Sequence, residues 1–406
     1  MKDLRTTLSA LFLILLPALL LATGPVTRQF NYPDAWGERG FNLTYSGSDR
    51  VEIIFSITSF SITDVTINGN TMQEVSLPEV FLPGDAGAPN LPGTGRFIAL
   101  PEGASPMLTI TGMRTETIPN VWVSPAPRIP LETEEGLEYS MNEAIYSSNA
   151  PYPAEPVKLS DITDIRGVDA AMLGVTPFQY NPVTKELTVI RDLRVEIRFE
   201  EGEGTFGEDR LRSRWWDRIL KDVFLNYSAL PKINHDQVAR GPMEAGAEYL
   251  IITPDISTFI AWADTIRRWR NTQGISTKVV TMSDIGSNTT TAIESYINNA
   301  YNTWVTPPSA VLLMADYGTG GTTSAGITSP IYDNYCISDH TYADVSGNHM
   351  ADIAFARLTA QNETQLATMI DKFIGYETNP PTNPDFYNKP ITAMGWQTER
   401  WFQLCS

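Results

Sequence analysis

The sequence predicts an all-β region followed by an incomplete α/β domain with a mainly parallel sheet, and three observations carry this prediction. Residues 29–200 contain many short β-rich runs separated by turns with Pro and Gly, which is typical of a sandwich or a similar all-β domain. From residue 247 onward, apolar runs alternate with amphipathic segments, as in parallel strands connected by helices. The last apolar run begins at Ile391, so we expect the α/β domain to be unfinished at Ser406.

The amino terminus has the three parts of a secretory signal peptide, which we place at residues 1–24. Lys2 and Arg5 precede a largely apolar run over 8–21, and small residues follow at 22–24. A membrane anchor is the alternative, but the run is shorter than the roughly 20 apolar residues that a spanning helix needs, and Pro17 interrupts it. We therefore expect an exported protein, secreted or at the cell surface, without a membrane span.

Length and charge limit the possible functions. A chain of 406 residues is expected to hold two or three domains of roughly 150 residues each. The formal net charge of −18 argues against nucleic-acid binding, which requires a basic patch. The sequence has only two cysteines and three histidines, so a scaffold built on disulfides is excluded and a catalytic histidine has few candidates.

Several strands of the first region can be placed from local signals. Residues 51–57 form a β-rich run, and the run 65–67 leads into Asn68-Gly69, which is a strong hairpin signal. Residues 187–190 and 193–199 are expected to be two strands, and the second alternates apolar with charged residues as a half-buried strand does.

A helix is expected over 212–225, followed by a polar linker over 231–246. The linker contains Pro and Gly and has no clear period, which favours an exposed segment where proteases can cut. Arg240 lies within it, either as an activation cleavage point or as an ordinary solvated arginine.

The α/β region is predicted in more detail. Its strands are expected at 249–252, 277–280, 310–314 and 353–356, and its helices at 259–270, 291–301 and 363–376. In the first helix, the spacing of Phe259, Trp262, Ile266 and Trp269 puts them on one buried face. Sheets of this kind bind ligands beyond the carboxyl ends of their strands.

Stretches in both halves of the chain resemble the gingipain family of secreted cysteine endopeptidases. The second half resembles the opening of the family's catalytic domain in the segments 247–252 (AEYLII), 269–277 (WRNTQGIST), 311–316 (VLLMAD), 338–342 (SDHTY), 347–349 (GNH) and 352–357 (DIAFAR). The first half resembles the family's pro-domain in the segments 87–92 (GAPNLP) and 178–182 (FQYNP).

This resemblance implies a caspase-like α/β fold and a Cys/His dyad, in which a thiolate attacks the peptide carbonyl and an imidazole handles the protons. It divides the chain into a signal peptide at 1–24, a β-rich pro-domain at 25–230, a linker at 231–246 and the first part of the peptidase domain at 247–406. In the family both dyad residues follow later strands, so no catalytic residue is assigned here and this chain alone is expected to be inactive. The pro-domain is expected to cover the active-site face, and the substrates are expected to be proteins or peptides.

The remaining candidates each have more than one interpretation. Cys336, His340 and His349 could form a nucleophile with its base, a metal cluster or ordinary loop structure. Asp316 follows an apolar strand, where it either caps a turn or binds a structural calcium ion of the kind the resemblance implies. Cys405 is expected to be a buried thiol, and the Trp215-Trp216 pair is expected to serve packing.

Two other classes of function stay open. A non-catalytic exported binding or surface protein could retain this fold. A metal-dependent hydrolase could use Asp316, His340 and His349, with a metal-bound hydroxide as nucleophile.

Overall fold

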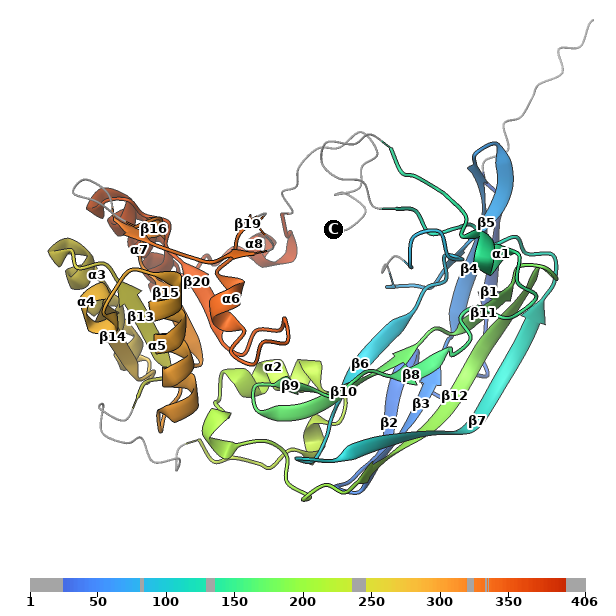
Figure 1. Ribbon diagram of the computed structural model, residues 1–406, viewed down its shortest axis with the longest axis horizontal. Coiled ribbons are helices and arrows are strands. Elements are labelled where there is room, and N and C mark those ends of the chain that lie inside the picture. Colours follow the sequence, from blue (N-terminus) through green and yellow to red (C-terminus); the bar gives the residue numbers. More distant parts are fainter. Residues whose placement is uncertain are drawn as a thin grey trace, which may run out of the picture.

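The structure is a computed structural model, and it describes residues 25–80, 84–128, 136–235, 246–319, 325–332, 334 and 336–391. A β-rich region and an α/β region are joined by a small helical segment (Figure 1). The predicted signal peptide, Arg240, Cys405 and nearly all of the expected strand at 391–394 lie outside the described residues. Within the described residues, no helix is both long and apolar enough to cross a membrane.

The β-rich region consists of three antiparallel sheets, as predicted for an all-β region. One has the order β1-β4-β5, another has β6-β10-β8 with β9 added to β10, and the largest has β11-β12-β3-β2 with β7 on the other side of β12. The strands are β1 (Thr27–Asn31), β2 (Gly40–Ser46), β3 (Arg50–Ser56), β4 (Ser59–Ile67), β5 (Asn70–Ser76), β6 (Thr94–Ala99), β7 (Ser105–Ile118), β8 (Val157–Leu159), β9 (Thr163–Ile165), β10 (Val168–Val175), β11 (Phe178–Asn181) and β12 (Glu186–Glu200).

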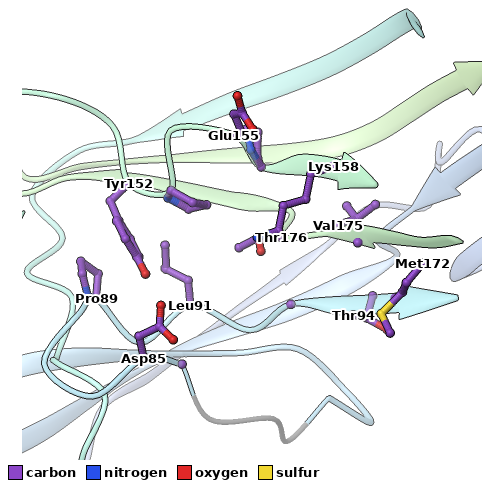
Figure 2. Close-up of a pocket in the computed structure, with 16 residues that line it drawn as sticks. Asp85, Pro89, Leu91, Thr94, Tyr152, Glu155, Lys158, Met172, Val175 and Thr176 are labelled. Carbon is purple, nitrogen blue, oxygen red and sulfur yellow. The ribbon is translucent and has the colours of Figure 1, made fainter. Parts of the chain in front are cut away.

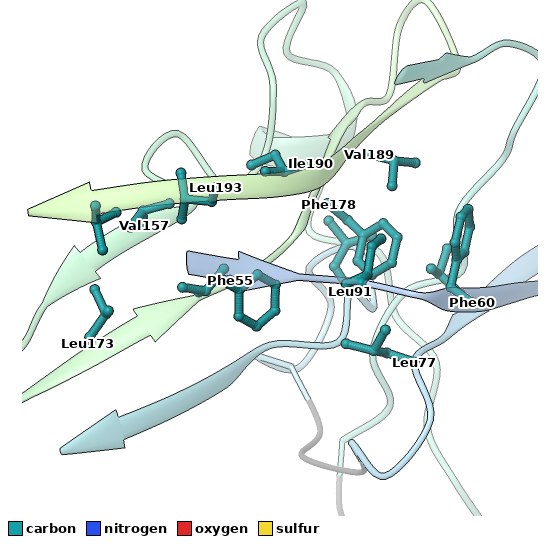
Figure 3. Close-up of a cluster of buried hydrophobic side chains, with 14 of the residues drawn as sticks. Phe55, Phe60, Leu77, Leu91, Val157, Leu173, Phe178, Val189, Ile190 and Leu193 are labelled. Carbon is teal, nitrogen blue, oxygen red and sulfur yellow. The ribbon is translucent and has the colours of Figure 1, made fainter. Parts of the chain in front are cut away.

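One core fills the space between these sheets. Figure 3 shows Phe55 of β3 and Leu193 of β12 lying near Leu173 of the facing strand β10. Phe60 packs edge-on against Phe178, with ring centroids 5.2 Å apart. Burial of such side chains contributes about 1.5–3 kcal/mol each, so this core stabilises the region without any disulfide among the described residues.

The hairpin predicted at Asn68-Gly69 is confirmed, whereas the division of 187–199 into two strands is wrong. Asn68 and Gly69 have φ angles of 50° and 78°, as a two-residue turn between β4 and β5 requires. β12 runs unbroken from Glu186 to Glu200 and has register shifts against β7, one of them between Ile190 and Asp192. A β-bulge accommodates the polar residues that suggested a break, so the strand continues.

A short helical segment connects the two regions. It contains η1 (Asp209–Leu211), α2 (Trp216–Val223) and η2 (Tyr227–Ala229), while α1 (Glu143–Tyr146) lies earlier in the β-rich region. The helix expected over 212–225 is therefore shorter than predicted. Arg212 has an extended backbone, and the guanidinium of Arg214 donates to the carbonyl of Gly274 at 2.8 Å, so tertiary contacts replace the first helical turn.

The α/β region contains a four-stranded parallel sheet with the order β14-β13-β15-β20, as predicted. Its elements are β13 (Tyr249–Thr253), α3 (Ser257–Thr272), β14 (Thr277–Thr281), α4 (Met282–Ile285), α5 (Thr290–Thr303), β15 (Ala310–Leu313), β16 (Asp316–Tyr317), β17 (Gly326–Ile327), β18 (Ile331–Tyr332), β19 (Cys336–Ile337), α6 (His340–Ala343), β20 (Ala354–Arg357), α7 (Glu363–Thr378) and α8 (Asp385–Asn388). Helices cover this sheet, which agrees with the caspase-like arrangement that the resemblance implies.

The apolar face predicted for α3 is confirmed at its centre. Phe259 and Ile266 are buried, while Trp262 and Trp269 are half-buried. Trp269 donates from Nε1 to the carboxylate of Glu377 on α7 at 2.7 Å, so this tryptophan joins two helices by a polar contact at the edge of the core.

Candidate functional site

The strand order draws attention to the carboxyl ends of β13 and β15. β13 is the first strand of the sheet in the chain, yet it lies between β14 and β15, so the connections leave it in opposite directions. This is the topological switch point at which open parallel sheets bind ligands. Thr253 ends β13, and Asp316 follows β15 after two buried residues.

Arg357 organises the loops at the carboxyl ends of the parallel strands, which form the carboxyl edge of the sheet. It is the last residue of β20, and its guanidinium donates to the carbonyls of Ala315 at 3.0 Å and Ile327 at 3.0 Å. It also forms a bidentate pair with Asp339, through Nε at 2.8 Å and Nη2 at 2.8 Å. One planar cation therefore fixes three loop segments relative to the end of the sheet.

Asp339 is held as a carboxylate in this network. Burial alone would raise its pKa, but the hydrogen bonds from Arg357 and from the Ser329 hydroxyl lower the pKa below its ordinary value. The charge on Asp339 balances that of Arg357 inside the loop cluster. The pair acts as a structural support for the carboxyl edge.

Asp316 follows β15 after two residues and begins the short strand β16. One carboxylate oxygen accepts from the backbone N–H of Tyr317 and the other from Nε2 of Gln361, both at 2.8 Å. Across the described ranges, no group of three or more His, Cys, Asp or Glu side chains could hold a metal ion. A calcium ion at Asp316 would therefore need carbonyl oxygens and water as further ligands, and its binding stays a prediction.

Cys336 begins β19, His340 begins α6 and His349 lies in the loop after α6, but no hydrogen bond between described residues joins the cysteine to either histidine. Cys336 is an exposed free thiol on β19. Nε2 of His340 lies 3.1 Å from the carbonyl oxygen of His349, and the His349 ring packs edge-on against Tyr332. These contacts are those of ordinary loop residues, and they leave the imidazole of His340 engaged with the backbone.

The opposite edge of the sheet, at the amino ends of the strands, is occupied by the first part of the chain. Trp216 of α2 donates from Nε1 to the carbonyl of Ser309 at 2.8 Å, immediately before β15. Arg210 donates to the carbonyls of Tyr301 and Trp304 at 2.7 and 3.2 Å. The packing expected for the Trp215-Trp216 pair is seen at Trp216, which is buried.

A single arginine forms the centre of this contact. Arg166, in the turn between β9 and β10, is 1% exposed and reaches Asp352 just before β20. Arg166 carries no signal of its own in the sequence. Gly167 was the available signal, since a glycine between two strand-like runs marks a turn.

A separate cavity of about 350 Å³ lies in the β-rich region beside β6, β8 and β10 (Figure 2). Asp85, Tyr152 and Lys158 are among the side chains at its wall. A Cβ atom at Gly95 would lie 2.7 Å from the Met172 sulfur, so a larger residue there requires the Met172 side chain to move. This cavity is distant from the carboxyl edge of the parallel sheet and contains no pairing of a nucleophile with a base.

The architecture is that of a two-part protein, in which a β-rich region rests on an α/β domain. The sequence model of Propeptide_C25 matches residues 43–233, and that of Peptidase family C25 matches residues 243–399. The chain belongs to peptidase family C25, with its propeptide and peptidase parts in this order.

The relatives are gingipains of Porphyromonas gingivalis. The chain is 26% identical to Gingipain R2 over 319 residues, which is 76% of this chain and 40% of that protein. It is 22% identical to Lys-gingipain over 371 residues, which is 87% of this chain and 20% of that protein. A solved complex of the RgpB pro- and mature domains from the same organism is 22% identical, covers 46% of this chain and 97% of that chain, and gives a TM-score of 0.41. The chain spans two fifths or less of the length of Gingipain R2 and of Lys-gingipain.

Proposed function

We propose that this chain belongs to the precursor of an exported cysteine endopeptidase that cleaves proteins or peptides. The observation that carries the proposal is the succession of the two family matches, propeptide at 43–233 and peptidase at 243–399. The parallel sheet supplies a switch point at the carboxyl ends of β13 and β15, where a peptide substrate would bind.

The chemistry requires a cysteine and a histidine that this sequence does not assign. The thiolate would attack the scissile carbonyl, the imidazolium would protonate the departing amine, and water would then hydrolyse the thioester. The described residues would support the site. Arg357 and Asp339 fix the loops around the carboxyl edge on which such a pair would act.

The sequence of the reading frame beyond Ser406 tests this proposal. A histidine followed some tens of residues later by a cysteine, each after an apolar strand, would support it. An extension that lacks this pair would instead favour the second candidate, a non-catalytic exported binding or surface protein that keeps the fold.

Export and calcium binding are further parts of the proposal. The apolar run over 8–21 supports export, and amino-terminal sequencing of the exported precursor, before the linker is cut, would detect cleavage near residue 24. Asp316 is the proposed calcium ligand, and metal analysis of the purified protein with Asp316→Ala as control would test it. Zinc in place of calcium would favour the metal-dependent hydrolase instead.

A further inference from the structure

The tip of the β9–β10 hairpin has an unusual backbone for the residue that it carries. Arg166 and Gly167 have φ angles of 51° and 76°, so both lie in the left-handed region. Glycine tolerates this conformation, whereas arginine is disfavoured there. The carboxylate of Asp164 accepts from the Gly167 N–H at 2.9 Å and stabilises the turn. A disfavoured backbone at a buried side chain points to a function for that side chain.

The Arg166 guanidinium fills a socket of oxygen atoms at the amino ends of β15 and β20. Its Nη1 donates to the carbonyls of Asp352 at 2.6 Å and Pro308 at 3.2 Å, and its Nη2 donates to the Ser309 hydroxyl at 3.3 Å. The backbone N–H of Arg166 also donates to the Asp352 carboxylate at 3.2 Å. The socket matches the planar fork of an arginine, which a lysine ammonium would not reproduce.

Contacts outside the socket also hold the Arg166 side chain in position. Nε of Arg166 donates to the carbonyl of Leu211 at 2.8 Å, within the same region. The guanidinium lies over the ring of Trp216, at 4.9 Å from its centroid. These contacts orient the guanidinium toward the socket.

Other contacts surround the socket and use backbone carbonyls in the same way. The guanidinium of Arg214 donates to the carbonyl of Gly274, just before β14. In the other direction, Asn348 of the α/β region donates from Nδ2 to the Thr163 hydroxyl at 2.9 Å. Leu211 is buried in the apolar core of the α/β region, so the two regions exchange apolar contacts as well.

We propose that the Arg166 socket is the docking site that holds the propeptide part on the peptidase part after the linker between them is cut. The partner that the socket takes is the β9–β10 hairpin of the propeptide itself, recognised through one guanidinium. This inference rests on the proposed precursor function, because it concerns a processed precursor.

The socket lies at the opposite end of the sheet from the proposed catalytic edge. The hydrogen bonds that join a described residue of 25–230 to a described residue of 246–391 lie near the amino ends of the strands or in the loops that precede them. Docking through Arg166 therefore leaves the carboxyl ends of β13 and β15 free of these contacts. Retention of the propeptide and obstruction of substrate are thus separate properties, which different residues would control.

The experiment uses the full-length precursor with a site for a specific processing protease inserted after Arg240. After cleavage, gel filtration and a binding isotherm measure whether the two parts stay together, in the presence of iodoacetamide to stop any peptidase activity. We expect the unmodified pair to co-elute. Arg166→Met should raise the dissociation constant about 30-fold or more, since it leaves buried acceptors without their donor.

Two further variants serve as a control and as a second test. Arg198→Met removes an arginine whose side chain is 63% exposed and which lies outside the contact, so it should leave the dissociation constant unchanged. Arg166→Lys keeps the charge but loses the planar fork of the guanidinium, and it should also weaken binding. This variant tests the proposal even if Arg166→Met impairs folding of the uncut chain. An unchanged dissociation constant in both Arg166 variants would overturn the proposal. A precursor that lacks peptidase activity but shows Arg166-dependent binding would refute the proposed function alone.

Discussion

Arg166 and Asp352 are 186 residues apart in the sequence, yet both the backbone and the side chain of Arg166 bond to Asp352. The Arg166 N–H binds the carboxylate, and its guanidinium binds the carbonyl of the same residue. Asp352 also accepts from the Ser346 N–H at 2.8 Å through its second carboxylate oxygen. One buried aspartate thus joins the tip of the β9–β10 hairpin to the loop that leads into β20.

Asp352→Ala should destabilise the chain substantially. The side chain is 1% exposed, and its removal leaves the buried Arg166 N–H and the part-buried Ser346 N–H without their acceptor beside a buried guanidinium. We expect a loss of about 3 kcal/mol in the free energy of unfolding, measured by urea denaturation. Asp371→Ala, on the exposed side of α7, is the matched control and should change it by less than about 0.5 kcal/mol. Equal effects of the two substitutions would contradict the assigned role of Asp352.

Alanine substitutions at two glycines in similar turns separate the effect of backbone strain from the effect of a close contact with η1. Gly69 and Gly167 have φ angles of 78° and 76°, so alanine is strained at both. A Cβ atom at Gly69 meets nothing within 4 Å, whereas at Gly167 it would lie 2.4 Å from Cδ1 of Leu211. Gly69→Ala should therefore cost about 1 kcal/mol and Gly167→Ala about 2 kcal/mol or more in thermal denaturation. If both cost the same, the contact between the hairpin and η1 is looser than the structure shows.

Asp164 should make stability depend on pH near neutrality. Burial raises the pKa of Asp164 to about 6, and the charges of Asp352, Asp169 and Glu208 add to the rise. The folded chain then holds this proton to a higher pH than the unfolded chain does. The contribution of Asp164 to stability is therefore greatest near pH 4 and decreases as the pH rises through 6.

Asp164→Asn isolates this effect, since an asparagine side chain can still accept from the Gly167 N–H. Denaturation midpoints measured at pH 5 and pH 7.5 should differ less in the variant than in the unmodified chain. An unchanged difference would mean that Asp164 does not titrate in this range.

The pair of Arg357 and Asp339 should be essential to the carboxyl edge. Arg357→Met leaves the carboxylate of Asp339 and several carbonyls without their donor, and we expect a loss of about 3 kcal/mol in urea denaturation. Arg268→Met is the control, because its ion pair with Asp264 lies on an exposed helix surface and should cost less than about 1 kcal/mol. Comparable losses would show that the network does not support the loops.

The same pair also predicts the acid response. Because the pKa of Asp339 is lowered in the folded chain, its contribution is complete above its ordinary pKa of about 4 and is lost as the pH falls below that value. Asp339→Asn should reduce the loss of stability between pH 4 and pH 3. The opposite signs for Asp164 and Asp339 make the two titrations separable.

Periodicity predicted most of the elements, because they bury a continuous apolar face. The strands around Ile251 and Leu312 and the helix around Ile266 are examples, since their burial depends on local pattern alone. The run 187–199 was predicted as two strands because the polar residues Arg191 and Asp192 suggest a turn. In the structure Asp192 is buried within β12 and accepts hydrogen bonds from the Trp36 N–H and the Ser56 hydroxyl.

The contacts that organise the edges of the sheet could not be predicted. Arg166 depends on Asp352 in another region, and Arg357 binds carbonyls that become neighbours only after β15, β17 and β20 assemble. The expectation that the pro-domain covers the active-site face stays a prediction, because the described contacts lie at the opposite end of the sheet. Asp316 was placed correctly, but its two amide donors did not follow from the sequence.

An activity assay on the full-length, processed protein tests most directly whether the chain belongs to a cysteine endopeptidase precursor. Hydrolysis of a mixed fluorogenic peptide library should appear after cleavage of the linker and should be abolished by iodoacetamide, whereas Cys336→Ser should leave the hydrolysis and its loss on alkylation unchanged. A folded, processed protein that hydrolyses no peptide, or whose activity survives alkylation, would contradict the claim.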